Sequence, residues 1–416
     1  MKIMNDLESI LALWRELETA RLDYVLATVV AVEGSSYRKP GAHMLLAPDG
    51  RRAGTVSGGC LEADVAKRAW WLTADGPVVE RYSTAEDDGD RPYGSGCGGV
   101  IYILLERRET AGRLLAVQQS AFEERTPLAI ATILEGPGTG RRAFAGLPEP
   151  LSAANSNGHS PTETAGRGGS ALRQLAERSL RQCESIEESE IDGAVIRAWA
   201  NYSPARPGLW IFGAGDDAIP LHRLAREMGW YVSVADGRSH LATRQRFPAA
   251  NDVRVLPIAD LPGSFAGTAA TEPAPFGLHS TDAAVVMAHS FEQDSKILAA
   301  LLVLDPAPAY IGVLGPQRRT RELLAEAARL LGISSAPERV QHWLARLHAP
   351  MGLDLGGEAP AAVALSVLAE IQQSFSAASG LPLRQVRADR FRLSNALQGP
   401  QETSPATQGE PSTPGR

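Results

Sequence analysis

The sequence predicts an α/β protein in which an N-terminal α/β domain is followed by a doubly wound parallel sheet. Two patterns predict this class. Val- and Ile-rich runs such as 25–33 and 100–105 alternate with segments whose apolar residues have helical spacing. Residues 209–238 read, in order, as a strand, a glycine turn, a helix and a second strand. The chain has 416 residues, 44% of them hydrophobic and 21% charged, which is enough for two or three packed units.

Residues 1–147 form the first expected domain. The run 24–33 is rich in Val and Thr and ends at Gly34, as a buried strand would. Pro48-Asp49-Gly50 is a turn sequence between two short extended runs and predicts a hairpin. We expect helices at 1–18, 61–72 and 113–123, strands at 24–33, 100–105 and 128–134, and hairpin strands at 42–47 and 51–56.

The remainder divides by composition. Residues 148–170 are dominated by Ser, Gly, Asn, Pro and Thr, which predicts a flexible linker. Residues 171–203 are expected to supply a connecting helix and strand. We expect the second domain at 204–395, with a closing helix near its end, and a disordered tail at 396–416.

The second domain begins with a dinucleotide-fold pattern. Gly213 would permit the tight turn after the first strand, and Gly215 would let a pyrophosphate approach the backbone at a helix N-terminus. Asp236 ends the second strand, where a carboxylate can bind ribose hydroxyls. Asp216 and Asp217, however, place two negative charges beside the supposed phosphate. The pattern predicts a Rossmann-like fold and leaves a bound nucleotide open.

Two cysteines lie in glycine-rich turns. Gly58 and Gly59 precede Cys60, which stands at the start of a predicted helix, where amide dipoles lower a thiol pKa. Around Cys97, Gly98 and Gly99 leave the backbone bare just before a strand. Such turns suit close approach of an anionic ligand or attack by sulfur. Each cysteine could equally be a small residue packed in a tight turn.

A third loop follows the first strand. Ser35 and Arg38 lie in the sequence Gly34–Gly41, and a guanidinium there could bind a phosphate with two hydrogen bonds. The same residues could also form an ordinary solvated loop.

Composition excludes several classes of function. The net charge of −7 and the absence of a basic run argue against nucleic acid as a partner. The longest apolar runs are too short to span a membrane, and the N-terminus lacks a signal-peptide pattern. Three cysteines with no C-x-x-C pair indicate a reducing compartment, so we expect a cytoplasmic protein. The scattered histidines show no zinc-ligand spacing.

An ordered series of motifs, taken together, resembles the XdhC/CoxI family of accessory proteins for molybdenum hydroxylases. The resemblance covers most of residues 5–375. The motifs are GSSYRKPGAHM, VSGGCLE, GCGG, IFGAG, YIGVLG and PMGLDLG.

The resemblance implies binding of molybdenum cofactor (molybdopterin), support of its sulfuration by a cysteine desulfurase, and delivery to an apo-enzyme such as xanthine dehydrogenase. We hypothesise that Cys60 and Cys97 lie near the molybdenum as thiolate ligands or sulfur relays, because soft thiolates favour sulfur chemistry. The pterin phosphate would then lie against glycine amides and Arg38. Two alternatives remain: an NAD(P)-dependent oxidoreductase using Gly213, Gly215 and Asp236, and a non-catalytic scaffold joining the desulfurase to its client. A homodimer also stays open.

Overall fold

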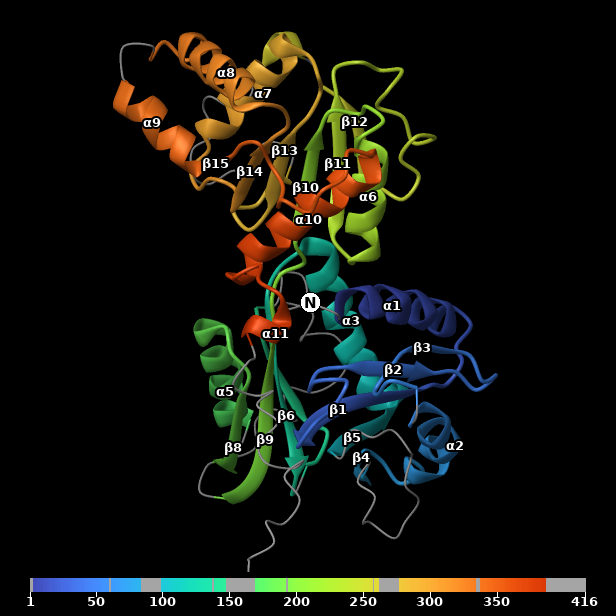
Figure 1. The fold of residues 1–416 in the computed structure, drawn as a ribbon. Helices are drawn as coiled ribbons and strands as arrows, with labels where there is room; N and C mark the ends of the chain where they lie inside the picture. Colours follow the sequence, from blue (N-terminus) through green and yellow to red (C-terminus); the bar gives the residue numbers. More distant parts are fainter. Residues whose placement is uncertain are drawn as a thin grey trace, which may run out of the picture.

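The structure, a computed structural model, contains three β-sheets and confirms the predicted α/β class with a Rossmann-like C-terminal domain (Figure 1). None of the helices within the part of the chain that it describes is long and apolar enough to cross a membrane. The structure describes residues 3–59, 61–83, 99–136, 138–146, 169–191, 194–256, 258–261, 277–333 and 337–386.

The first sheet is antiparallel, with the order β3-β2-β1-β5-β4. Its central strand is β1 (Val25–Glu33), whose alternate side chains point to opposite faces of the sheet. Helices cover both faces, so β1 is buried on both sides. Leu26 packs with helices α1 and α3, whereas Val25 and Ala27 pack with α2. The other elements are β2 (His43–Leu46), β3 (Arg52–Gly54), β4 (Val78–Ser83), β5 (Val100–Arg107), α1 (Ile3–Thr19), α2 (Glu62–Leu72) and α3 (Arg108–Glu124).

The predicted hairpin and the expected helices of this region are present, but β4 was not foreseen. Its sequence, VVERYS, mixes polar and apolar residues because β4 is an edge strand and only half-buried.

The second sheet joins segments from both sides of residues 148–170. Strands β6 (Leu128–Glu135) and β9 (Ala194–Ser203) pair antiparallel, and the sheet order is β7-β6-β9-β8. The segment 171–203, expected to supply a connecting helix and strand, contributes β9 to the sheet that begins before residue 147. The expected linker and the tail at 396–416 lie almost entirely outside the described residues. The remaining elements are β7 (Arg142–Ala145), α5 (Gly169–Gln182) and β8 (Ile186–Ile191).

The third sheet is parallel and six-stranded, with the order β12-β11-β10-β13-β14-β15. This is the doubly wound Rossmann order, with its switch point between β10 and β13. Its strands are β10 (Gly208–Phe212), β11 (Tyr231–Asp236), β12 (Asp252–Val255), β13 (Ala283–Val286), β14 (Tyr310–Val313) and β15 (Leu347–His348).

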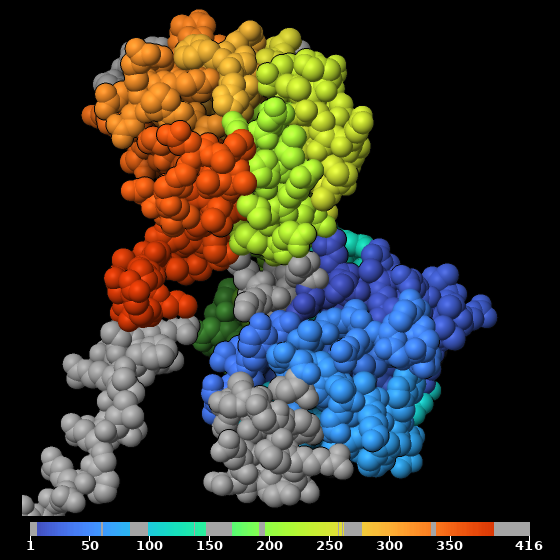
Figure 2. Space-filling model, turned by 45° about the vertical axis from the view of Figure 1, so that its right-hand side comes forward, coloured from blue at the N-terminus to red at the C-terminus, as the bar shows by residue number. Residues whose placement is uncertain are grey.

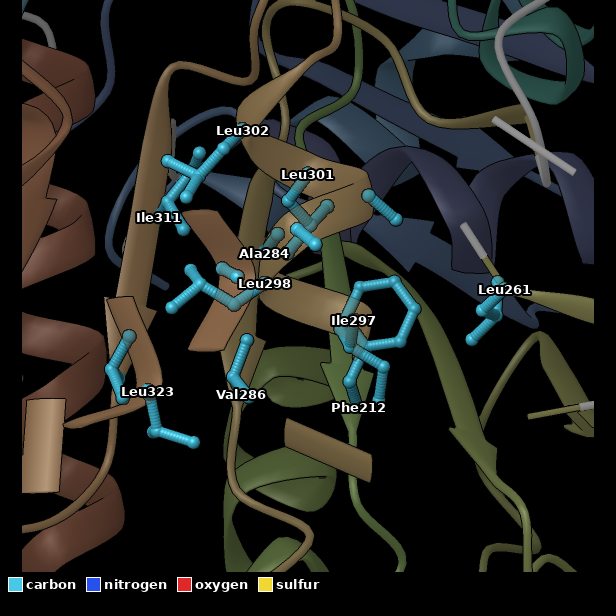
Figure 3. Close-up of a cluster of buried hydrophobic side chains, with 14 of the residues drawn as sticks. Phe212, Leu261, Ala284, Val286, Ile297, Leu298, Leu301, Leu302, Ile311 and Leu323 are labelled. Carbon is cyan, nitrogen blue, oxygen red and sulfur yellow. The ribbon is translucent and has the colours of Figure 1, made fainter. Parts of the chain in front are cut away.

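Helices cover both faces of this sheet. Helices α7, α8 and α9 cover one face, and Figure 3 shows Ile297 and Leu298 of α7 packed against Phe212 and Val286 of the sheet. Helices α6 and α10 cover the other face. Their bounds are α6 (Ala218–Glu227), α7 (Phe291–Leu302), α8 (Gln317–Leu330), α9 (Pro337–Arg346) and α10 (Pro360–Ser376), followed by the short α11 (Leu383–Val386).

Charged side chains join the two halves of the molecule, which are stacked in Figure 2. Arg125, at the end of α3, forms a buried ion pair with Asp282 at the base of β13. Glu8 of α1 pairs with Arg226 of α6 at 2.6 Å. The guanidinium of Arg206 lies 4.0 Å from the ring centre of Phe122, and burial lowers the Arg206 pKa to about 10. The Rossmann domain is thus tied to α1 and α3.

Candidate functional site

The loop after β1 lies against two glycines, Gly58 and Gly99, that are each two residues from a cysteine in the sequence. A side chain at Gly99 would collide with the backbone carbonyl of Ser35, so only glycine fits this close approach. A Cβ at Gly58 would lie 3.5 Å from Cγ of Tyr37. Ser35, Gly58 and Gly99, predicted as separate parts of one site, therefore lie around a single loop.

The turn that carries residue 60 is held by two residues that the sequence reasoning did not single out. Ser57 Oγ accepts hydrogen bonds from the amides of Gly59 and Leu61, both at 3.2 Å. It donates to Glu62 at 2.6 Å, and the Ser57 amide donates to the same carboxylate at 2.8 Å. The amides on both sides of position 60 are thus fixed by one hydroxyl.

Glu62 is 3% exposed and remains a good acceptor despite its burial. Burial alone would raise its pKa, but the hydrogen bonds from Ser57 hold the net pKa below its usual value. Ser57 and Glu62 are five residues apart, not three as in a capping box, so the sequence carries no capping signal for this pair.

Arg38 does not point to an open phosphate site. Its guanidinium pairs with Asp6 of α1 at 2.7 Å, and its Nε donates to Thr55 Oγ1 at 2.9 Å. Only 13% of its side chain is exposed. In this structure Arg38 fastens the loop to α1 and to the start of the Ser57 turn, and its contact with a phosphate stays a prediction.

Three predicted site residues, Cys60, Cys97 and Gly98, lie outside the described residues. Cys183 is exposed, free and located just after α5. Among the described residues no group of three or more His, Cys, Asp or Glu could hold a metal ion.

The glycine turn of the Rossmann domain forms as the motif predicts. Gly213 has φ +130°, and a Cβ there would lie 2.5 Å from the carbonyl oxygen of Met287 after β13. Gly215 has more room, with His289 nearest to its Cβ position at 3.9 Å. The turn therefore lies at the switch point between β10 and β13.

Asp236 does not present its carboxylate to a ribose. The residue is fully buried, and its Oδ2 accepts the amide hydrogen of Ala214 at 2.8 Å. Arg238 donates to both carboxylate oxygens, through Nε and its backbone amide to Oδ1 at 2.9 Å each and through a terminal nitrogen to Oδ2 at 2.7 Å. Burial raises the pKa of Asp236, but these donors lower it by more, so the net shift of the pKa is downward. The hydrogen-bond acceptor positions of the carboxylate are therefore occupied by protein donors.

A second buried aspartate, on α7, binds a backbone amide of the loop after β13 in the same way. Asp294 of α7 accepts the Ala288 amide at 3.0 Å and pairs with Arg319 at 2.7 Å. Burial raises its pKa above the usual value. Sequence reasoning missed Asp294, because nothing local distinguishes it from other acids in a first helical turn.

Asp216 and Asp217 of the glycine turn both have side-chain partners. Asp216 lies 2.7 Å from Arg246, and Asp217 lies 3.2 Å from Nε2 of His289. The predicted repulsion of a phosphate by Asp216 is thus partly offset by the Arg246 guanidinium.

The fold and the sites define a class of protein. An N-terminal α/β domain with glycine-rich turns is joined to a Rossmann domain. The buried carboxylates Asp236 and Asp294 of the Rossmann domain are hydrogen-bonded by the protein's own amides and arginines. Residues 17–83 match the XdhC and CoxI family model, and residues 209–371 match the model of the XdhC Rossmann domain. The chain belongs to the XdhC and CoxI family.

Three relatives illustrate the similarity. A Bacillus subtilis protein, named as a probable subunit of xanthine dehydrogenase, is 30% identical over 84% of this chain and 92% of its own. The Escherichia coli molybdenum cofactor insertion chaperone PaoD is 35% identical over 26% of this chain and 33% of its own. A crystal structure from Bacillus halodurans, described as a xanthine dehydrogenase, aligns with a TM-score of 0.62 and 27% identity over 89% of this chain and 96% of that one.

Proposed function

We propose that this protein binds the molybdenum cofactor and assists the maturation of a molybdenum hydroxylase such as a xanthine dehydrogenase. One relative is named as part of a xanthine dehydrogenase, and another as a molybdenum cofactor insertion chaperone. A role in handling the molybdenum cofactor of such an enzyme is consistent with the names of both relatives.

The observation that supports this proposal most directly is the contact of one loop with described glycines that lie close to both cysteines in the sequence. Ser35 touches Gly99, two residues after Cys97, and Tyr37 lies against Gly58, two residues before Cys60. Gly59 has φ +116°, and no atom of the described residues lies within 4 Å of its Cβ position. This bare backbone fits the approach of a large ligand.

In the proposed role, Cys60 and Cys97 act as thiolate ligands or as sulfur relays, because soft thiolates suit both molybdenum and sulfur transfer. The chain shelters the cofactor, a cysteine desulfurase supplies the sulfur, and the cofactor passes to the apo-hydroxylase. The bound cargo supplies the redox metal, whereas the chain supplies enclosure and thiols.

The test is activation of a purified apo-xanthine dehydrogenase by cofactor-loaded protein, with Cys60→Ala and Cys97→Ala compared with the parent. Cys183→Ala is the matched control, because Cys183 is an exposed cysteine on another element. We expect activation to fall several-fold in the first two variants and to stay unchanged in the control, with equal thermal stability throughout. Unchanged activation in both test variants would instead favour the non-catalytic scaffold.

The geometry of Asp236 argues against the alternative of an NAD(P)-dependent oxidoreductase. Its carboxylate is buried and bonded to Ala214 and Arg238, so it offers no acceptor to a ribose. Isothermal titration of the parent protein with NAD⁺ and NADP⁺ should show no binding. Saturable heat with either nucleotide would reinstate that alternative.

A further inference from the structure

A cleft of about 420 Å³ opens between the first and second sheets. Residues of β1, β4, β5, β6 and β9 line it, together with the turn after β6. Its floor is apolar: Val30 is 3% and Leu134 is 4% exposed, and Val79 packs against the same cluster. Clefts of this size with apolar walls and a few polar groups are typical of small-molecule sites.

An acid and a guanidinium line this cleft without touching each other. Glu135 of β6 and Arg197 of β9 are register partners in the second sheet, at an irregularity of the pairing. A hydrogen bond to Glu187 raises the pKa of Arg197, and the nearby charge of Glu135 adds to this shift. Glu135 itself has no hydrogen-bond or ion-pair partner among the described residues. Its carboxylate oxygens are therefore acceptors that the described chain leaves unused.

Arg197 also keeps donors for a ligand. Its Nε donates to Glu187 at 2.6 Å, and its guanidinium carbon lies 5.7 Å from the ring centre of Tyr102. A guanidinium carries five N–H donors. Within the part of the chain that the structure describes, the terminal nitrogens of Arg197 have no hydrogen-bond partner. Acceptors on β6 thus lie beside donors on β9.

The charges around the cleft balance. Arg81 also lines it, and Glu187 is bonded to Arg197, so the positive charges of Arg81 and Arg197 stand against the negative charges of Glu135 and Glu187. A balanced set of charges attracts an anion less than a free guanidinium does. The cleft therefore suits a neutral group with both donors and acceptors better than it suits a phosphate.

One end of the cleft lies near the glycine turns of the candidate site. Tyr102, which lines the cleft, donates its hydroxyl hydrogen to Glu33 at 2.9 Å. The carbonyl oxygen of Glu33 lies 2.9 Å from the Cβ position of Gly99. A ligand in the cleft would therefore lie near the end of β1 and the loop that carries Ser35.

We infer that this cleft binds the aminopyrimidinone edge of a flat heterocycle, with Glu135 accepting its adjacent N–H groups and Arg197 donating to its carbonyl oxygen. A carboxylate accepts two parallel hydrogen bonds, and bonds to an ionised group are the strong ones. Pterins and guanine share this edge. The inference rests on the proposed function, whose cargo contains a pterin, and adds which residues recognise it.

The test measures equilibrium binding of a metal-free pterin, guanosine and adenosine to the full chain; adenosine lacks the edge. Glu135→Gln replaces one acceptor oxygen by a donor. Its matched control is Glu190→Gln, at an exposed glutamate of β8 that does not line the cleft. Arg197→Gln removes the guanidinium, and Glu187→Gln is its control, because it changes the same contact and leaves the guanidinium in place.

We expect the parent to bind the pterin, guanosine or both, and not adenosine; the probe that binds more tightly identifies the source of the edge. Glu135→Gln and Arg197→Gln should each bind that probe about tenfold more weakly, the order of effect of losing a paired hydrogen-bond contact to a base edge. Both controls should match the parent. Equal affinity for adenosine, parental affinity in Glu135→Gln, or no binding of pterin and guanosine would overturn the inference.

The molybdenum cofactor is titrated alongside these probes. Cofactor binding that is as tight in Glu135→Gln as in the parent would overturn the inference and leave the proposed function intact. Failure of the parent to bind the cofactor would instead contradict the proposed function, whereas guanosine binding that is weakened in Glu135→Gln would still support the assignment of the cleft.

Discussion

The carboxylate of Asp236 accepts the backbone amide hydrogen of Ala214 at 2.8 Å, so the acid at the end of β11 holds the glycine turn that follows β10. In a dinucleotide-binding domain the corresponding acid faces the ribose. Here Arg238 saturates the remaining acceptor sites. In this protein the carboxylate at the position that binds ribose in dinucleotide-binding domains stabilises the glycine turn instead.

Removing that carboxylate should destabilise the protein. Asp236→Ala leaves the Ala214 amide without its acceptor and Arg238 without its carboxylate partner. Because Arg238 is 38% exposed, water moderates the cost of losing this ion pair. We therefore expect the free energy of unfolding to fall by about 2 kcal/mol. Asp236→Asn keeps an acceptor and should lose less. Urea unfolding measures both, and unchanged stability in Asp236→Ala would contradict the structural role.

A methyl group at Gly213 should lower the free energy of unfolding far more than a methyl group at Gly50, another glycine with positive φ. Gly213 (φ +130°) has the Met287 carbonyl 2.5 Å from its Cβ position, whereas Gly50 (φ +87°) has nothing within 4 Å. Gly50→Ala should cost about 1 kcal/mol, because only the positive φ is strained. Gly213→Ala must also move backbone and should cost at least about 3 kcal/mol. Equal costs in thermal or urea unfolding would show that the close approach is not rigid.

The buried His43 of β2 predicts a loss of stability in mild acid. It bonds Thr28 and Gln118, and burial, helped by Arg142, lowers its pKa to about 4. The unfolded chain therefore takes up this proton near pH 6.5, before the folded protein does. This contribution is constant above pH 7 and is lost as the pH falls from about 6.5 towards 4.

Between pH 7.5 and 5.5 this group should lower the free energy of unfolding by about 1 kcal/mol. His43→Gln keeps a polar side chain that does not titrate, so the variant should show a correspondingly smaller decrease. Urea unfolding at the two pH values gives both decreases, and their difference isolates His43 from other titrating groups. An identical decrease in parent and variant would contradict the assignment.

Local patterns were enough to predict the elements whose signals lie within a few residues. The strand β1 follows from its run of Val and other apolar residues, and the turn at Gly213 follows from backbone sterics. The pairing of β6 with β9 was missed, because it joins strands separated by the polar segment 148–170. Pairing over such a distance has no local signature.

The structure brings three of the predicted site residues, Ser35, Gly58 and Gly99, around one loop, whereas their part in binding stays a prediction. Glycines on either side of a loop indicate close backbone approach, which is a signal that the sequence carries. It could not show that Arg38 pairs with Asp6, because that acid lies on another element. Whether a charged side chain is free or paired depends on tertiary contacts.

The most direct test of the account is to measure molybdenum and pterin in the protein fraction after incubation with molybdenum cofactor and gel filtration. The parent and the Cys60→Ala, Cys97→Ala double variant are compared, with Cys183→Ala as the control. The account predicts that both molybdenum and pterin co-elute with the parent and the control and are reduced in the double variant. Absence of both from the parent fraction would contradict the proposal that this chain carries the cofactor.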